Sequence, residues 1–280
     1  MMETQASDGS KRPLFFVLLS LSIIFLALAA LFGYRAWKGA SDSQGPDAAA
    51  SGESSPADDF VALALERARS GDVDGALQAL EVSISADPEG AAEAYYYRGL
   101  IHAELGETSN ALDDFEKAIE INPHSAEYYA SRGTVYLSTG RPATALDDFT
   151  KAIQIDPQNA ATYVNRGQAY AHLKMFDLAE KDFNYALKLD DRLMAAYFNR
   201  GVLYMTLEKP EEAVADFTQC IELDADAPAP YFNRAVALID LGRRDEAAAD
   251  LTIYLGMTQD EEGQHQAQAL LDNLVESASP

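Results

Sequence analysis

The sequence predicts an all-α protein built from a repeated pair of helices, with one apolar helix near the amino terminus. Three observations support this prediction. Aromatic, small and bulky residues return every 34 residues from Ala57 onward. A run of 21 residues without a charge extends from Leu14 to Tyr34. Residues 39–56, between these two parts, are almost all small, acidic or turn-forming.

The composition excludes several classes of function. The chain has 280 residues and a formal net charge of −24, and such a surface repels phosphate backbones. We therefore expect no nucleic-acid partner. The single cysteine, Cys220, excludes an intramolecular disulfide and a cysteine-based zinc cage.

The apolar run predicts a single transmembrane signal-anchor helix over residues 13–38, after a short tail of residues 1–12. Its charge-free part, residues 14–34, would form a helix about 31 Å long, which matches the hydrocarbon core of a bilayer. Lys11 and Arg12 precede the run, and this adjacent pair favours an amino terminus inside the cytoplasm. The rest of the chain would then be extracytoplasmic.

Cleavage of this segment is the alternative. Ala27, Leu28 and Ala29 resemble a signal-peptidase site, and cleavage there would give a secreted or periplasmic protein. The apolar run is longer than the apolar region of most signal peptides, which favours an uncleaved anchor. Residues 39–56 cannot bury a core, and we expect a flexible tether with a reach of roughly 25 Å.

The repeat divides residues 57–261 into six units, with Ala91 left over. The units are 57–90, 92–125, 126–159, 160–193, 194–227 and 228–261. Position 4 of each unit is aromatic: Phe60, Tyr95, Tyr129, Tyr163, Tyr197 and Tyr231. Position 20 is always alanine: Ala76, Ala111, Ala145, Ala179, Ala213 and Ala247. Position 24 is large and apolar: Leu80, Phe115, Phe149, Phe183, Phe217 and Leu251.

This pattern predicts two antiparallel helices per unit, joined by a tight turn. Position 8 is a glycine in four units and an alanine in the first and last, Ala64 and Ala235. A glycine inside a helix costs about 1 kcal/mol relative to alanine, so its recurrence indicates a packing requirement. The turn carries a glycine in four units, with Lys174 and Glu208 in its place in the other two. A proline at position 32 is expected to stop the second helix, although Asp191 and Ala225 replace it in two units.

The period of 34, with aromatic-x-x-x-Gly, then Ala-x-x-x-Phe, then Pro, resembles the tetratricopeptide repeat (TPR) family. The Arg-Gly pairs, as in Tyr-x-x-Arg-Gly, suggest a membrane-anchored member of an Arg-Gly subtype. The resemblance implies a right-handed α-solenoid whose first helices line a concave groove that holds peptides. A capping helix and tail should follow over residues 262–280. Apolar residues recur there at helical spacing: Ala267, Leu270, Leu271, Leu274 and Val275.

Five units pair an arginine at position 7 with an aspartate at position 23. The pairs are Arg98 and Asp114, Arg132 and Asp148, Arg166 and Asp182, Arg200 and Asp216, and Arg234 and Asp250. Both positions are equidistant from the turn, so we predict an Arg–Asp ladder within or between neighbouring units that fixes register. The first unit has Leu63 and Ala79 instead, so both charges disappear together.

The resemblance also places the candidate binding site. It implies that position 6 faces the groove, where Asn165, Asn199 and Asn233 would form a ladder of amides for a peptide backbone. The alternative is that each amide is solvated or bonds to a neighbouring helix. Other predicted groove contacts are Val164, Phe198, Phe232, Met205, Tyr96 and Tyr97.

The function expected from these features is a membrane-anchored adaptor that binds an extended peptide segment of a partner protein. Acidic residues at one end (Asp58, Glu93, Glu104 and Glu127) suit a segment that is basic at one end. The alternative is a scaffold that self-associates into a homo-oligomer without capturing a peptide. The histidines lie at unrelated positions, and Cys220 occupies a site that is alanine in other units. We therefore expect no enzyme activity, cofactor or metal.

Overall fold

The computed structural model describes residues 56–276, which form 13 helices and no strand. The all-helical prediction is therefore confirmed for this part of the chain. The tail of residues 1–12, the apolar helix of residues 13–38 and nearly all of the linker lie outside the described residues. None of the helices in residues 56–276 is both long enough and apolar enough to span a bilayer.

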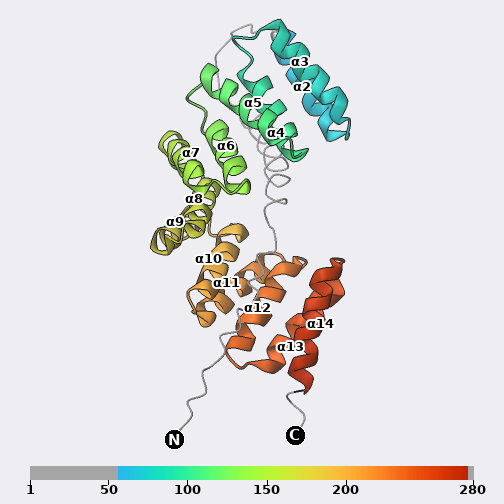
Figure 1. Cartoon of the computed structure of the whole chain (residues 1–280), viewed down its shortest axis with the longest axis vertical. Coiled ribbons are helices and arrows are strands. Elements are labelled where there is room, and N and C mark those ends of the chain that lie inside the picture. Colours follow the sequence, from blue (N-terminus) through green and yellow to red (C-terminus); the bar gives the residue numbers. More distant parts are fainter. Residues whose placement is uncertain (1–55, 277–280) are drawn as a thin grey trace, which may run out of the picture. The chain divides into compact units, whose positions relative to one another are not determined.

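The helices follow one another as pairs, one pair for each 34-residue unit (Figure 1). The first helices are α2 (Pro56–Arg69), α4 (Ala92–Glu104), α6 (Ala126–Ser138), α8 (Ala160–His172), α10 (Met194–Thr206) and α12 (Pro228–Asp240). The second helices are α3 (Val73–Ala86), α5 (Thr108–Ile121), α7 (Pro142–Ile155), α9 (Phe176–Leu189), α11 (Pro210–Leu223) and α13 (Arg244–Met257). Every second helix therefore begins at position 17 and ends at position 30 of its unit.

Packing in the array is between sequence neighbours. The two helices of a unit pack on each other, and each second helix packs on the first helix of the next unit. From α4 onward, each first helix also contacts the first helix of the next unit. Units that contact only their neighbours define a helical solenoid.

The core of each unit combines a small residue with a large one. The alanines at position 20 are fully buried, and so are the phenylalanines and leucines at position 24. The glycine at position 8 lies directly against this large residue: a Cβ added at Gly167 would lie 2.6 Å from Cε1 of Phe183. Units with a phenylalanine have a glycine there, whereas Ala64 and Ala235 accompany leucine. The packing requirement predicted at position 8 therefore comes from the phenylalanine ring at position 24, which occupies the space that a Cβ would need.

The turn inside each unit needs a left-handed residue at position 15. Gly71, Gly106, Gly140 and Gly242 have φ values from 73° to 82°. Lys174 and Glu208 occupy the same position with φ values of 59° and 57°. Side chains other than glycine adopt this region at a steric cost of roughly 1 kcal/mol.

Lys174→Gly is expected to raise the free energy of unfolding by about 0.5–1 kcal/mol, because glycine adopts a positive φ without that cost. Glu208→Gly should have the same effect. Equilibrium urea unfolding measures both variants, and Gly140→Ala is the control that should lose stability. Reduced stability in both glycine variants would contradict the assignment of strain to this position.

Proline is not required to end the second helix, which corrects the sequence interpretation. Helices α9 and α11 end at the same position as the others although their units lack the proline. In both units, the aspartate at position 31 makes one backbone hydrogen bond to the helix and one side-chain hydrogen bond to the loop that follows. The backbone N–H groups of Asp190 and Asp224 donate to carbonyls four residues earlier. Their side chains accept hydrogen bonds from the backbone N–H of Arg192 (2.9 Å) and Asp226 (3.0 Å).

The array ends in α14 (Glu261–Glu276), which packs on α13. Ala267 and Leu274 are its buried apolar contacts. Val275, which the spacing placed in the same apolar set, is 63% exposed. A helix that buries one narrow stripe and presents polar residues elsewhere suits the end of a solenoid.

Candidate functional site

The structure brings each position-7 arginine together with the aspartate of its own unit. In all five pairs, Nε and Nη2 of the arginine donate to the two carboxylate oxygens, over 2.6–2.9 Å. The aspartates are 4–7% exposed. Bidentate pairs of this kind fix the relative position of two helices as well as their charges. The sequence left open whether the pairs form within or between units, and all five form within one.

Tyrosines of the same helix flank each arginine. Cζ of each arginine lies 5.4–5.9 Å from the centre of the position-4 ring, one turn earlier. In three units, Tyr136, Tyr170 and Tyr204 place a second ring at 5.8–6.0 Å, one turn later. A guanidinium between aromatic faces gains a further cation–π attraction.

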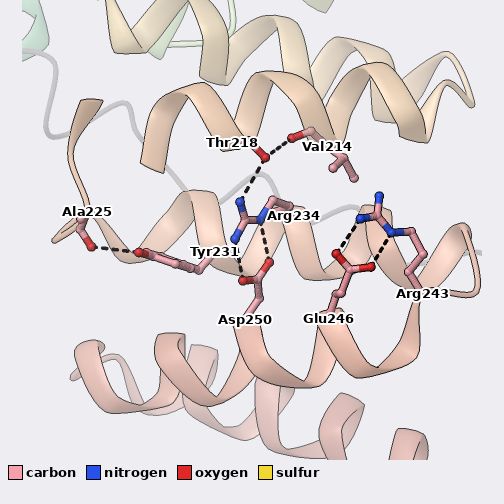
Figure 2. Close-up of polar contacts among 8 residues, drawn as sticks. All are labelled: Val214, Thr218, Ala225, Tyr231, Arg234, Arg243, Glu246 and Asp250. Atoms are coloured by element: carbon pink, nitrogen blue, oxygen red, sulfur yellow. Dashed lines mark hydrogen bonds and ion pairs between the residues drawn. The ribbon is translucent and has the colours of Figure 1, made fainter. Parts of the chain in front are cut away.

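Two of the arginines also reach the preceding unit. Nη1 of Arg234 donates to Oγ1 of Thr218 on α11 over 3.0 Å, while its other nitrogens bind Asp250 on α13 (Figure 2). Nη1 of Arg200 donates in the same way to Oδ1 of Asn184 on α9. Each of these side chains therefore connects three helices across a unit boundary.

The candidate amide row consists of Asn165 on α8, Asn199 on α10 and Asn233 on α12. All three side chains are partly exposed, and they lie on first helices that contact one another in sequence. Nδ2 of Asn199 and of Asn233 donates to the carbonyl four residues earlier, over 2.7 and 2.9 Å. Nδ2 of Asn165 makes a longer bond of 3.5 Å to Oγ1 of Thr134 in the preceding unit.

Most of the predicted apolar groove contacts belong to the core, which corrects the sequence prediction. Tyr96, Tyr97, Val164, Phe198 and Phe232 are only 2–7% exposed. The position-5 rings turn toward second helices: Phe198 lies 5.7 Å from the Phe217 ring, and Phe232 lies 5.1 Å from Tyr254. Buried rings cannot contact a ligand in this conformation.

Tyr96 packs in an aromatic cluster that joins the second and third units. Its ring lies 6.0 Å from Phe115 of its own unit and 4.8 Å from Tyr128 of the next unit. Oγ of Ser131 also donates to its hydroxyl over 3.4 Å. Position 6 of the second and third units is Tyr97 and Ser131, so these units lack the amide of the later ones.

Partly exposed apolar side chains lie on the same helices as the amide row. Met205 is one of the predicted contacts and is partly exposed. Val202, Val236 and Ile239 are partly exposed on the same helices, and Gln168 adds a polar group. Val202, Val236 and Gln168 all occupy position 9 of their units.

Cys220 and His102 make structural contacts. Cys220 is fully buried, and burial raises the pKa of its thiol to about 12, so the reactive thiolate is scarce at neutral pH. Nδ1 of His102 lies 2.6 Å from Oε2 of Glu107 beside the turn. Within residues 56–276, no group of three histidine, cysteine or acidic side chains could hold a metal ion.

Comparison with known proteins supports the repeat assignment. The family model of the tetratricopeptide repeat matches residues 92–125, 126–159, 160–192 and 195–226. These ranges coincide within one residue with the second to fifth units. A search of curated proteins found no match to the chain.

Several solved structures share the fold at low sequence identity. PilW, described as a widely conserved type IV pilus biogenesis factor, is 21% identical with a TM-score of 0.71; the match covers 77% of this chain and all of PilW. A thermophilic TPR protein of Thermus thermophilus is 22% identical with a TM-score of 0.56, over 64% of this chain and 98% of the other.

YrrB, described as a TPR protein with an unusual peptide-binding site, is 22% identical with a TM-score of 0.52, over 69% of this chain and 99% of YrrB. Likeness at this level of identity shows the fold alone. The family model and the helix pairs agree on the same unit, with the same register. The chain therefore contains tetratricopeptide repeats, from residue 92 to residue 226.

Proposed function

We propose that the chain is an adaptor that binds an extended segment of a partner protein along α8, α10 and α12. The observation that carries this proposal is the amide row: Asn165, Asn199 and Asn233 are partly exposed on three consecutive first helices. An amide offers both donors and acceptors, so a row of amides can bind a peptide backbone whatever its side chains are. YrrB, which has a similar fold, is described as having a peptide-binding site.

The side chains beside the row indicate which segment would fit. Val202, Met205, Val236 and Ile239 are partly exposed apolar contacts, which suit apolar side chains that alternate along an extended strand. Toward the other end of the array, Asp58, Glu93, Glu104 and Glu127 are exposed and acidic. A segment with basic residues at one end would be steered onto this surface.

The experiment is to replace Asn165, Asn199 and Asn233 together with alanine and to measure the capture of partners from membrane extracts. Each lost hydrogen bond is worth roughly 0.5–1.5 kcal/mol, so the loss of three should raise the dissociation constant at least about tenfold and reduce capture accordingly. The matched control is Asn110→Ala on α5, which lies on a second helix outside the row. Unchanged capture by a triple variant with an unchanged circular dichroism spectrum would rule out the amide row as the binding site.

A second candidate function is a self-associating scaffold. It is favoured by exposed apolar side chains at the carboxy-terminal end, namely Ile253, Met257 and Val275. The large negative charge opposes contact between copies at low salt. Light scattering of the purified chain over a range of concentrations decides this: a mass that rises with concentration supports the scaffold, and a constant monomer mass excludes it.

We also propose that residues 13–38 anchor the chain in a membrane, with the repeats outside the cytoplasm. The support is the charge-free run of residues 14–34 with basic residues on both sides. Alkaline carbonate extraction should leave the chain in the membrane pellet, and protease added from outside the cytoplasm should digest the repeats. A soluble chain whose amino terminus begins just after Ala29 would instead establish cleavage.

A further inference from the structure

The three amides of the row are held differently, and the difference arises at position 9 of the preceding unit. At the boundary between the fourth and fifth units, Nε2 of Gln168 donates to Oδ1 of Asn199 over 2.9 Å. Nδ2 of Asn199 donates to the carbonyl of Ala195 over 2.7 Å. Both ends of this amide are therefore engaged at once.

The other two boundaries lack this arrangement. At the boundary before Asn165, position 9 is Thr134, whose hydroxyl donates to the Ala130 carbonyl and accepts only the long bond from Asn165. At the boundary before Asn233, position 9 is Val202, which has no polar side-chain atom. Nδ2 of Asn233 still donates to the carbonyl of Ala229 over 2.9 Å.

We infer that Gln168 is a positioning residue that fixes the orientation of the Asn199 amide. A side-chain amide has two N–H donors and two acceptor lone pairs. Rotating the Asn199 amide by 180° would bring its oxygen against the Ala195 carbonyl and its nitrogen against the Gln168 donor. The bond to the Ala195 carbonyl would be lost, and the bond to Gln168 could be kept only if the Gln168 amide rotated as well, so a single orientation is favoured before any ligand arrives.

The fixed orientation has a consequence for binding, which rests on the proposed function. Gln168 uses one lone pair of the Asn199 oxygen, and the Ala195 carbonyl uses one of its two N–H groups. Asn199 therefore keeps one acceptor lone pair and one N–H donor, both in fixed directions. These match the N–H and C=O groups of one residue of an extended peptide. Because Asn199 is the central amide of the row, it becomes the ordered anchor, and its neighbours can adjust to the peptide. A preorganised group loses less freedom on binding and therefore binds more tightly.

The chain supplies its own pair of test substitutions. Gln168→Val installs the residue that the next unit has at this position, and Val202→Gln installs the donor at the following boundary. Each side chain already occurs at position 9 of a folded unit, so both variants should keep the helical circular dichroism spectrum. A melting temperature within a few degrees of the parent would verify this.

The primary readout is nuclear magnetic resonance of the full chain with labelled asparagine side chains. The ¹³Cγ resonance of Asn199 reports the hydrogen bond accepted by its oxygen. We expect Gln168→Val to shift this resonance and to leave that of Asn233 in place, while Val202→Gln should shift the Asn233 resonance. An Asn199 resonance unchanged by Gln168→Val would overturn the inference, whatever the protein binds.

A second readout separates this inference from the proposed function. The probe is a synthetic peptide, fluorescein-Lys-Lys-Val-Ala-Val-Ala-Val-amide, and its dissociation constant is measured by fluorescence anisotropy. Gln168→Val should weaken binding by about three- to tenfold, the effect of one lost neutral hydrogen bond. Equal affinity of Gln168→Val and the parent chain would overturn the role of Gln168 in binding. If the parent chain does not bind the probe but the resonance shifts, the proposed function fails and the positioning stands.

Discussion

Replacing Arg200 with leucine is expected to lower the free energy of unfolding by about 2–4 kcal/mol, because it leaves a buried carboxylate without its counter-ion. Asp216 is only 4% exposed, and Arg200 donates to both of its oxygens. The same substitution also removes the bond to Asn184 in the preceding unit. Equilibrium chemical unfolding of the variant and the parent measures the loss.

Removing both partners should cost much less than removing one. The first unit has Leu63 and Ala79 at the two positions, so the fold accepts an apolar pair there. The double variant Arg200→Leu with Asp216→Ala should therefore recover most of the stability that the single variant loses. A double variant as unstable as the single one would mean that Arg200 stabilises the fold mainly through its contacts with the Tyr197 and Tyr204 rings and its hydrogen bond to Asn184.

The pH dependence of the single variant follows from the same carboxylate. Burial raises the pKa of Asp216 above its ordinary value of 3.8, although the bonds from Arg200 oppose this. Without Arg200 the folded-state pKa rises further. A carboxyl whose folded pKa is raised costs stability above that pKa, and the cost disappears as the pH falls toward the unfolded value. The difference between the variant and the parent should therefore shrink between neutral pH and the acid range just above about pH 4.

Gly167→Ala is expected to destabilise the fold by about 1–2 kcal/mol, although alanine is the better helix former by about 1 kcal/mol. The new Cβ would lie 2.6 Å from Cε1 and 2.9 Å from Cδ1 of Phe183, and this ring is fully enclosed. The ring cannot retreat, so the two helices of the unit must separate. Thermal and chemical unfolding check the sign and the size of the change.

The first and last units provide the compensating substitution. They combine alanine at position 8 with leucine at position 24, as in Ala64 with Leu80 and Ala235 with Leu251. Phe183→Leu alone leaves a cavity and should cost about 1 kcal/mol. Combined with Gly167→Ala it should refill the space, with a favourable coupling of at least about 1 kcal/mol in the double-mutant cycle. Additive losses would show that the two side chains do not share one space.

Much of the fold was predictable because it depends on local geometry that repeats. The left-handed turn position could be read from its glycines, and Lys174 and Glu208 adopt the same backbone at the same place. The Arg–Asp pairs could be predicted because positions 7 and 23 lie the same number of residues before and after the turn. The end of the second helix could not be predicted from proline, because in the fourth and fifth units an aspartate at position 31 makes the closing hydrogen bonds without it.

The candidate site was only partly predictable. The face of a first helix could be assigned from the family pattern, which placed the amides at position 6. The direction of the position-5 rings could not be predicted in this way. It depends on the packing of Phe198 against Phe217 and of Phe232 against Tyr254, which lie on the second helices. Likewise, the bond from Gln168 to Asn199 crosses a unit boundary, and its existence depends on the spacing between two first helices.

The most direct test of the proposed binding face is site-specific photocrosslinking in the full chain. A p-benzoylphenylalanine at Met205, beside the amide row, is compared with one at Tyr185, which is 40% exposed on α9. Met205 should crosslink to a partner segment, the triple asparagine variant should lose this product, and Tyr185 should give none. A partner crosslinked from Tyr185 and not from Met205 would show that the binding face lies elsewhere.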